Sequence, residues 1–216
     1  MTRSSQSLTF ARRPIKSRDT HWAQSIGTGL ARMGVRPNAI SAASVGASML
    51  AGVALLLAPT AQPAPAVLLY AAAALCIQLR LLCNLFDGLV AVEGGRHSRA
   101  GGMWNELPDR FSDGICLVCA GAAAGLPTLG WLAAFLAAVT AYVRTLGASL
   151  GLAHSFVGPM AKQHRMAALT AGVVLAALES VLGRPHLAIG WALVVIVVGT
   201  ALTIVRRVRA IERDLR

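Results

Sequence analysis

The sequence is poor in charged residues and in aromatic residues. Of its 216 residues, 13% are charged, about half the share of an average soluble domain, whereas 56% are hydrophobic. So little charge, with a mean hydropathy of +0.62, excludes an ordinary water-soluble fold. The formal net charge is +11, but aromatic residues make up only 5% and are not interleaved with the basic ones, so a nucleic-acid partner that needs base stacking is not expected.

The sequence also lacks a cysteine pattern typical of zinc or disulfide sites, and it lacks an export signal. The four cysteines all fall inside apolar stretches, and the Cys-x-x-Cys at Cys116 and Cys119 has no second pair. We interpret all four as packing residues rather than zinc ligands or disulfide partners. The first 36 residues contain no apolar run with a small-residue cleavage site, so no secretory signal peptide is expected.

What the chain does contain is six long apolar runs. A helix needs about 20 such residues to cross the hydrocarbon core of a bilayer. The runs cover residues 38–59, 65–92, 104–125, 129–152, 164–182 and 186–205, and prolines and glycines separate them. The sequence therefore predicts an all-α integral membrane protein with six transmembrane helices. The second run is long enough to extend beyond the bilayer on one side.

The basic residues predict the orientation. Residues 1–36 hold seven basic residues and one acid, and residues 206–216 hold five and two, whereas the connections near 60–64 and 125–130 carry no charge. By the positive-inside rule both termini are cytoplasmic, in what we expect to be a bacterial inner membrane. The predicted organisation is a basic cytoplasmic segment over 1–36, a six-span membrane domain over 37–205 and a basic cytoplasmic tail over 206–216.

The segment before the first span has the pattern of an amphipathic helix. Within residues 17–35, Trp22, Ile26, Leu30 and Met33 recur at helical spacing. We expect this helix to lie on the cytoplasmic membrane surface and to contact lipid.

Two Gly-x-x-x-Gly pairs allow helices to approach closely. They are Gly121 with Gly125 and Gly147 with Gly151. The spacing leaves two interpretations open, helix packing within the chain and a homodimer seam.

Acidic residues gather where the second and third spans meet. A charged residue at mid-bilayer costs on the order of 2.5–3.5 kcal/mol on insertion scales. Asn84 and Asp87 share one helix face, and Asp109 and Asp113 share a face of the next helix, with Glu106 on the same stripe. A short loop joins the two helices, so we expect antiparallel neighbours whose oxygen ligands converge at the cytoplasmic end. Such ligands favour Mg²⁺ or Mn²⁺. The alternative is acids that are solvated at a helix entrance.

These residues resemble the signature of a known family. The run 87–91 (Asp-Gly-Leu-Val-Ala), followed by Asp109-x-x-x-Asp113, is similar to the signature of the CDP-alcohol phosphatidyltransferases, six-span membrane enzymes with a surface helix before the first span. The run 37–41 (Pro-Asn-Ala-Ile-Ser) resembles a Pro-Asn-x-x-Thr/Ser sequence often found at the start of that span.

Three positions depart from the family pattern D-x-x-D-G-x-x-A-R … G-x-x-x-D-x-x-x-D. Asn84 stands at the first Asp, Val92 at the Arg and Asn105 at the second Gly, and the connecting loop is longer. An amide oxygen still binds a metal ion, and Arg96 or Arg99 from the loop is a candidate for the missing cation.

The resemblance implies a site for a CDP-linked lipid. The implied ligands of two divalent ions, Mg²⁺ or Mn²⁺, are Asn84, Asp87, Asp109 and Asp113. Gly88 and Ala91 would let the cytidine and ribose approach the helix. Asp113 would be the general base that removes the proton of the acceptor hydroxyl as CMP leaves.

Four basic residues complete the candidate site. They are Arg80, Arg144, Lys162 and Arg165. The resemblance implies that cations in these regions bind the diphosphate or the phosphate of the acceptor, which makes a phosphorylated polyol a candidate acceptor. Alternatively, Lys162 and Arg165 only obey the positive-inside rule, and Arg80 only neutralises Asp87.

The leading hypothesis is a transferase of phospholipid synthesis that moves a phosphatidyl group from CDP-diacylglycerol to an alcohol. The reversed use, a CDP-alcohol that donates to diacylglycerol, stays open. The departures at Asn84, Val92 and Asn105 favour a second hypothesis, a catalytically weakened or inactive relative that binds metal and CDP-lipid. A small cation transporter is a third, although the acids lie at one membrane edge and no inverted repeat is evident.

Overall fold

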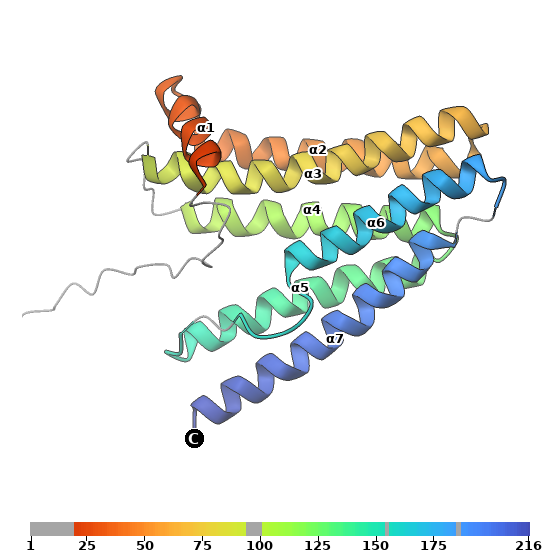
Figure 1. Cartoon of the computed structure of the whole chain (residues 1–216). Coiled ribbons are helices and arrows are strands. Elements are labelled where there is room, and N and C mark those ends of the chain that lie inside the picture. The colour runs from red at the N-terminus through yellow and green to blue at the C-terminus, as the bar shows by residue number, and fades with distance from the viewer. Residues whose placement is uncertain (1–19, 94–100, 154–155, 185–186) are drawn as a thin grey trace, which may run out of the picture.

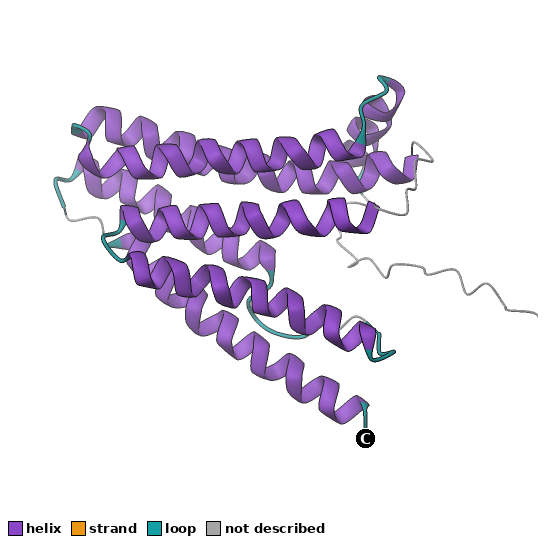
Figure 2. Ribbon diagram, turned by 180° about the vertical axis from the view of Figure 1, so that it is seen from behind, coloured by secondary structure: helices purple, strands orange, loops and turns teal. Residues whose placement is uncertain are grey.

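The structure is a computed structural model that describes residues 20–93, 101–153, 156–184 and 187–216. Within these ranges every regular element is helical and there is no strand, as Figures 1 and 2 show. The elements are α1 (His21–Arg32), α2 (Pro37–Leu57), the short 3₁₀ turn η2 (Ala58–Thr60), α3 (Pro63–Glu93), α4 (Gly101–Ala123), α5 (Pro127–Ser149), α6 (Lys162–Val181) and α7 (Ala188–Asp214).

Proline and glycine set the helix ends, as the sequence predicted. Helices α2, α3 and α5 begin with Pro37, Pro63 and Pro127, where the missing N–H would have no helical partner. Gly125 and Gly183 follow α4 and α6 with φ of +69° and +60°, a conformation that glycine adopts without strain. Helix α3 has 31 residues and is about 46 Å long, so it exceeds the roughly 30 Å hydrocarbon core.

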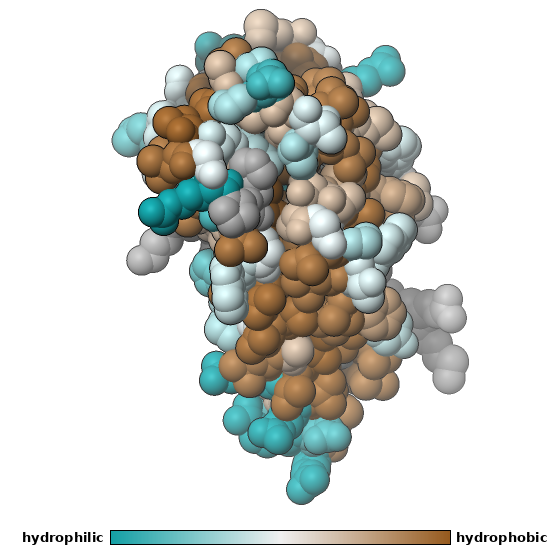
Figure 3. All heavy atoms as spheres, turned by 90° about the vertical axis from the view of Figure 1, so that its right-hand side faces the viewer, coloured by the Kyte–Doolittle hydropathy of each residue, from teal (hydrophilic) through white to brown (hydrophobic). Residues whose placement is uncertain are grey.

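Five of the described helices are long and apolar enough to cross a membrane. They are Pro37–Thr60, Pro63–Val92, Pro127–Ser149, Lys162–Val181 and Ala188–Asp214. Helix α4 has similar length but carries Glu106, Asp109, Arg110 and Asp113. Large apolar side chains such as Leu68, Phe135 and Trp191 are exposed. Figure 3 shows a continuous apolar surface over the lower middle of the molecule, with hydrophilic side chains at the lower end and others over the upper part. This distribution suits a lipid environment.

Helix α2 lies against both α3 and α4, whereas α3 and α4 contact each other little. This differs from the prediction that the second and third spans are direct neighbours. The physical reason is that the buried face of α2 is made of small residues, among them Ser44, Ala47, Ser48 and Ala51, which let it pack closely against both helices. Helix α6 packs against α3 and α7, and α5 packs against α4 and α7 (Figure 1).

Glycines of both Gly-x-x-x-Gly pairs serve packing within the chain. A Cβ at Gly121 would lie 2.6 Å from the Cα of Gly130, so the backbones of α4 and α5 touch there. Gly147 faces the side chain of Ile211 on α7. A homodimer stays a prediction.

Helix α1 packs across the C-terminal end of α3, which carries Asp87. Ala23 is buried, and a Cβ at Gly27 would lie 3.0 Å from the Cβ of Leu89. Trp22 and Ile26 lie at the edge of this contact and are about half exposed. Trp22 meets the ring of Phe86 on α3 edge-on, with centroids 6.1 Å apart. A helix is therefore present over 21–32, within the predicted range 17–35, of which residues 17–19 lie outside the described ranges. Its place on the membrane surface stays a prediction.

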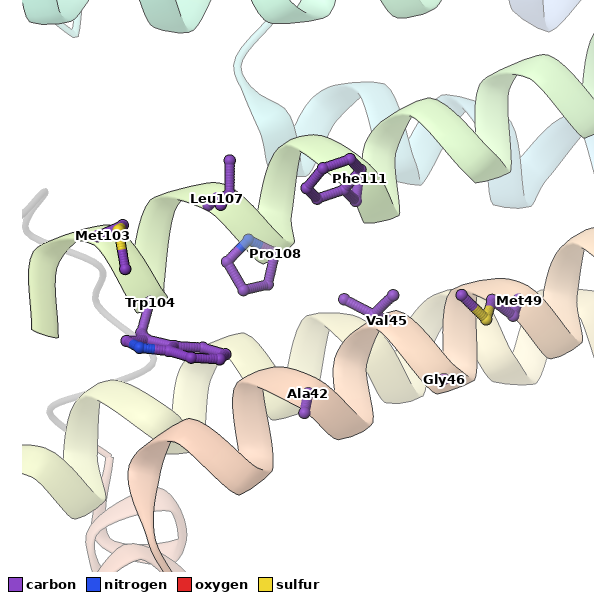
Figure 4. Close-up of a pocket in the computed structure, with 9 residues that line it drawn as sticks. All are labelled: Ala42, Val45, Gly46, Met49, Met103, Trp104, Leu107, Pro108 and Phe111. Atoms are coloured by element: carbon purple, nitrogen blue, oxygen red, sulfur yellow. The ribbon is translucent and has the colours of Figure 1, made fainter. Parts of the chain in front are cut away.

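An apolar groove of about 490 Å³ lies between the facing side chains of α2 and α4 (Figure 4). Its lining is Ala42, Val45, Gly46, Met49, Met103, Trp104, Leu107, Pro108 and Phe111. By helical geometry these α4 residues lie mainly on the face opposite Asp109 and Asp113. The groove therefore belongs to the outer surface and not to the acidic region.

Candidate active site

Helices α3 and α4 bring four oxygen-bearing side chains to the ends that lead toward residues 94–100. Asn84 and Asp87 come from α3, and Asp109 and Asp113 from α4. The three aspartates are almost fully buried, with at most 8% of any residue exposed. Buried carboxylates are costly unless they are paired, so their partners define the chemistry of the region.

Asp87 is held by a residue of α2. The hydroxyl of Ser41 donates to Oδ2 of Asp87 over 2.8 Å. Ser41 was not among the predicted site residues. The sequence signal for it was the Pro-Asn-x-x-Ser run at the start of the first span.

Asp113 is bound by two buried arginines. Nη2 of Arg80 lies 2.5 Å from Oδ1, and Nη2 of Arg165 lies 2.9 Å from Oδ2. The side chain of Arg80 is fully buried and that of Arg165 is 2% exposed. Arg80 therefore makes its ion pair with Asp113 of α4, whereas the sequence offered Asp87 as its partner. Helix α6 supplies the second arginine.

Asp109 is paired with the first residue of α6. Nζ of Lys162 lies 2.5 Å from Oδ2 of Asp109. The other carboxylate oxygen, Oδ1, is buried and has no hydrogen-bond partner in the part of the chain that the structure describes. Among those residues, no donor therefore occupies Oδ1 of Asp109, which can still accept a hydrogen bond or bind an ion.

Arg144 of α5 belongs to a neighbouring ion-pair cluster. It lies 2.5 Å from Glu106 of α4, which also accepts from Arg110 over 2.8 Å. The guanidinium of Arg144 also stands 5.9 Å from the centre of the Phe156 ring. The sequence showed no acid near Arg144 in its own helix, and the structure provides one from α4.

The remaining predicted residues follow Asp87 on α3. Gly88 is buried, Ala91 is half-buried and Val92 is about half exposed. Arg96, Arg99 and the side chain of Asn105 lie outside what the structure describes.

Arg207 is a buried residue that the sequence assigned to the basic tail. Helix α7 continues past 205 to Asp214, and Arg207 lies on its buried face with 6% exposed. Its Nη1 donates to the carbonyl of Thr140 over 2.6 Å and its Nε to that of Val157 over 3.1 Å. It thereby fixes the segment before α6. Its four-residue spacing from Thr203 and from Ile211, which are also buried, was the available signal.

The donor set suits a divalent ion that prefers oxygen. Carboxylate and amide oxygens are the ligands of Mg²⁺ and Mn²⁺, and the unpaired buried Oδ1 of Asp109 is an open acceptor for one. Both oxygens of Asp113, however, already bind arginine. Among the described residues no three acidic, histidine or cysteine side chains are grouped as an ion would need. The residues therefore fit a metal ion held by fewer carboxylates than the sequence predicts.

Comparison with known proteins gives the fold. No protein-family model matches the chain, and no curated protein matches it. Solved structures of Mycobacterium tuberculosis phosphatidylinositol phosphate synthase (PgsA1) do. With CDP-DAG bound, that enzyme gives a TM-score of 0.71 at 21% identity, over 89% of this chain and 94% of that one. With manganese and citrate the TM-score is 0.69 at 21% identity, over 88% of each chain. The apo form gives a TM-score of 0.66 at 23% identity, over 86% of this chain and 93% of that one.

Proposed function

We propose that this chain is a CDP-alcohol phosphatidyltransferase that moves a phosphatidyl group from CDP-diacylglycerol to an alcohol and releases CMP. One observation carries the proposal: three buried aspartates, two of them paired with three cations, lie at one end of a fold shared with an enzyme crystallised with CDP-DAG. The pairs are Arg80 and Arg165 with Asp113, and Lys162 with Asp109, while Asp87 accepts from Ser41.

The cations are suited to phosphate. Lys162 and Arg165 lie in the first turn of α6, and Arg144 of α5 pairs with Glu106, one helical turn before Asp109 on α4. Arginine binds phosphate oxygens bidentately, and lysine adds a point charge. Gly88 and Ala91 present little side chain on α3, which leaves room for the cytidine. We therefore assign a phosphorylated polyol as the acceptor class.

Oxygen ligands from α3 and α4 would hold a divalent ion, in line with the manganese in a structure of similar fold. Asn84, Asp87 and Asp109 are the residues that would hold it. When bound, the ion supplies positive charge to the diphosphate as negative charge builds up in the transition state.

Asp113 is the proposed base. The acceptor oxygen attacks the lipid-side phosphorus, the bond from that phosphorus to the bridging oxygen breaks, and CMP leaves with the electron pair. The hydroxyl proton passes to Oδ2 of Asp113. That oxygen accepts from Arg165 in the structure, so the phosphate of the substrate must draw Arg165 away before the proton moves.

Membrane placement completes the proposal. Helix α4 completes the six spans, with Asp109 and Asp113 facing protein instead of lipid. Helix α1 lies on the cytoplasmic surface with Trp22 and Ile26 toward the lipid. The termini and the site are cytoplasmic because residues 1–36 and 206–216 carry most of the net positive charge. In a bacterium this is the inner membrane.

The deciding experiment is CMP release by the purified full-length chain in detergent. The assay contains CDP-diacylglycerol, Mg²⁺ or Mn²⁺ and a panel of alcohols and phosphopolyols. We expect CMP with one acceptor class and none after EDTA. A parallel assay with CDP-alcohols and diacylglycerol tests the reversed use.

A second candidate is a relative that binds CDP-lipid and metal without turnover. Asn84 and Val92 favour it, since each removes a charge from the family pattern. Binding of CDP-diacylglycerol and Mn²⁺ without CMP release from any acceptor would establish this second candidate and reject the transferase.

A further inference from the structure

The charges on α3 differ from the pattern that the chain otherwise resembles. Asn84 stands in place of a carboxylate and Val92 in place of an arginine, while Arg80 lies one helical turn before Asn84. Residues three, four and seven apart share a helix face, so Arg80 lies on the face of Asn84 and Asp87. The site face of α3 has therefore lost a negative charge and carries a positive one.

Arg80 occupies an oxygen that a second metal ion would need. Its side chain is fully buried, and Nη2 lies 2.5 Å from Oδ1 of Asp113, while Arg165 binds Oδ2. An ion on Oδ1 would displace Arg80 and leave a buried arginine without its partner. Breaking a buried pair in this way is strongly destabilising, because it leaves an uncompensated buried charge. Arg80 and an ion therefore compete for one position.

The charge balance agrees with a single ion. The family pattern has four carboxylates, and these are neutral together with two divalent ions. Three carboxylates, Arg80 and one divalent ion are also neutral. A second ion beside Arg80 would leave an excess of two positive charges in a buried region, which is strongly unfavourable. The count describes the site with substrates bound, in which Lys162 and Arg165 leave their ion pairs with Asp109 and Asp113 and balance the phosphates of the substrates.

Arg80 also has donors to spare. Its Nε and Nη1 are buried and have no hydrogen-bond partner among the described residues. In phosphoryl transfer an arginine can neutralise transition-state charge through such donors, much as a metal ion does. Arg80 is therefore equipped for both tasks of a second ion, to neutralise Asp113 and to bind the diphosphate.

We propose that Arg80 takes the place of one of the two divalent ions, so that the site binds a single ion held by Asn84, Asp87 and Asp109. The inference rests on the proposed function, because it concerns the metal that this transferase uses.

The test is the number of Mn²⁺ ions bound per chain. Full-length protein in detergent, with CDP-diacylglycerol present, is titrated with Mn²⁺, and free Mn²⁺ is measured by electron paramagnetic resonance. The wild type is expected to bind one ion. The double variant Arg80→Met with Asn84→Asp restores the four-carboxylate set and is expected to bind two. The exposed Arg206→Met is the matched control and is expected to bind one.

Two ions, or none, on the wild-type chain would overturn the inference, and so would a single ion on the folded double variant. If the double variant does not fold, the single variant Asn84→Asp is titrated instead, because it leaves Arg80 paired with Asp113. One Mn²⁺ ion bound more tightly than in the wild type would support the inference, and two ions would refute it. CMP release reports separately on the proposed function. Two ions with CMP release would reject only the role of Arg80, whereas one ion without CMP release would reject only the transferase.

Discussion

At the residue scale, the site is defined by how each buried carboxylate is satisfied. Asp113 has an arginine on each oxygen, Asp109 has Lys162 on one oxygen, and Asp87 accepts from Ser41. A buried charge must be paired, so these contacts are the condition for placing acids inside an apolar helix bundle. The same contacts set which oxygen is open to a metal ion or a proton.

Replacing Asp113 with Asn should lower kcat for CMP release by roughly 10²–10⁴-fold, the usual contribution of a general base. An amide cannot take the hydroxyl proton, and it leaves the buried Arg80 and Arg165 without a carboxylate. The exposed Asp214→Asn is the control, and thermal unfolding checks that both variants are folded. Near-wild-type turnover would remove Asp113 from the chemistry.

Replacing Ser41 with Ala should weaken Mn²⁺ binding about 10–100-fold, because groups that orient a metal ligand typically contribute that much affinity. The variant removes the hydrogen bond to Oδ2 of Asp87. Ser44→Ala is matched, since Ser44 is also buried on α2 but donates to the carbonyl of Ser41. Equal affinity in the two variants would mean that Ser41 does not position Asp87.

At the element scale, α7 fixes the segment that leads into α6 and its cations. Arg207 donates to the carbonyls of Thr140 and Val157, and Oγ1 of Thr203 accepts from the N–H of Met160 over 2.9 Å. These bonds fix the segment that leads into Lys162, the first residue of α6. The direction of that segment determines where the first turn of α6 begins.

Replacing Arg207 with Met should raise the KM for the acceptor severalfold and lower the unfolding temperature by about 2–4 °C, the shift expected for roughly 1 kcal/mol in a chain of this size. Two carbonyl hydrogen bonds are lost, and the first turn of α6 becomes less firmly placed. Arg206→Met removes an exposed arginine from the same helix and serves as the control. Identical KM values in the two variants would contradict the role of α7.

At the scale of the whole molecule, apolar side chains face outward while charges are buried at one end. Arg80, Asp87, Asp113, Arg165 and Arg207 are all buried. Such a distribution is stable where the surroundings are lipid, and it confines the polar chemistry to one end of the bundle.

The orientation can be tested by labelling with a membrane-impermeant maleimide. In a chain whose four native cysteines are replaced by alanine, Arg213→Cys should react only from the cytoplasmic side of bacterial inner-membrane vesicles. Arg184→Cys, at the turn between α6 and α7, should react only from the opposite side. Labelling with the sides exchanged would reverse the topology.

Much of this architecture could be predicted because the signals are local. The apolar runs and their Pro and Gly breaks predicted helices that the structure contains, such as α2 from Pro37 and α3 from Pro63. The position of α2 against both α3 and α4 could not be predicted, because it depends on how small side chains on separate helices fit together.

The sequence by itself determined that the chain forms apolar helices, and that Asp87, Asp109 and Asp113 share a small set of helix faces, because composition and spacing act along the chain. Only the tertiary structure decided which partner each acid takes. Arg80 pairs with Asp113 instead of Asp87, and Arg207, which the sequence assigned to the basic tail, is buried on α7. Such ion pairs join residues far apart in sequence, so they depend on the packing of whole helices.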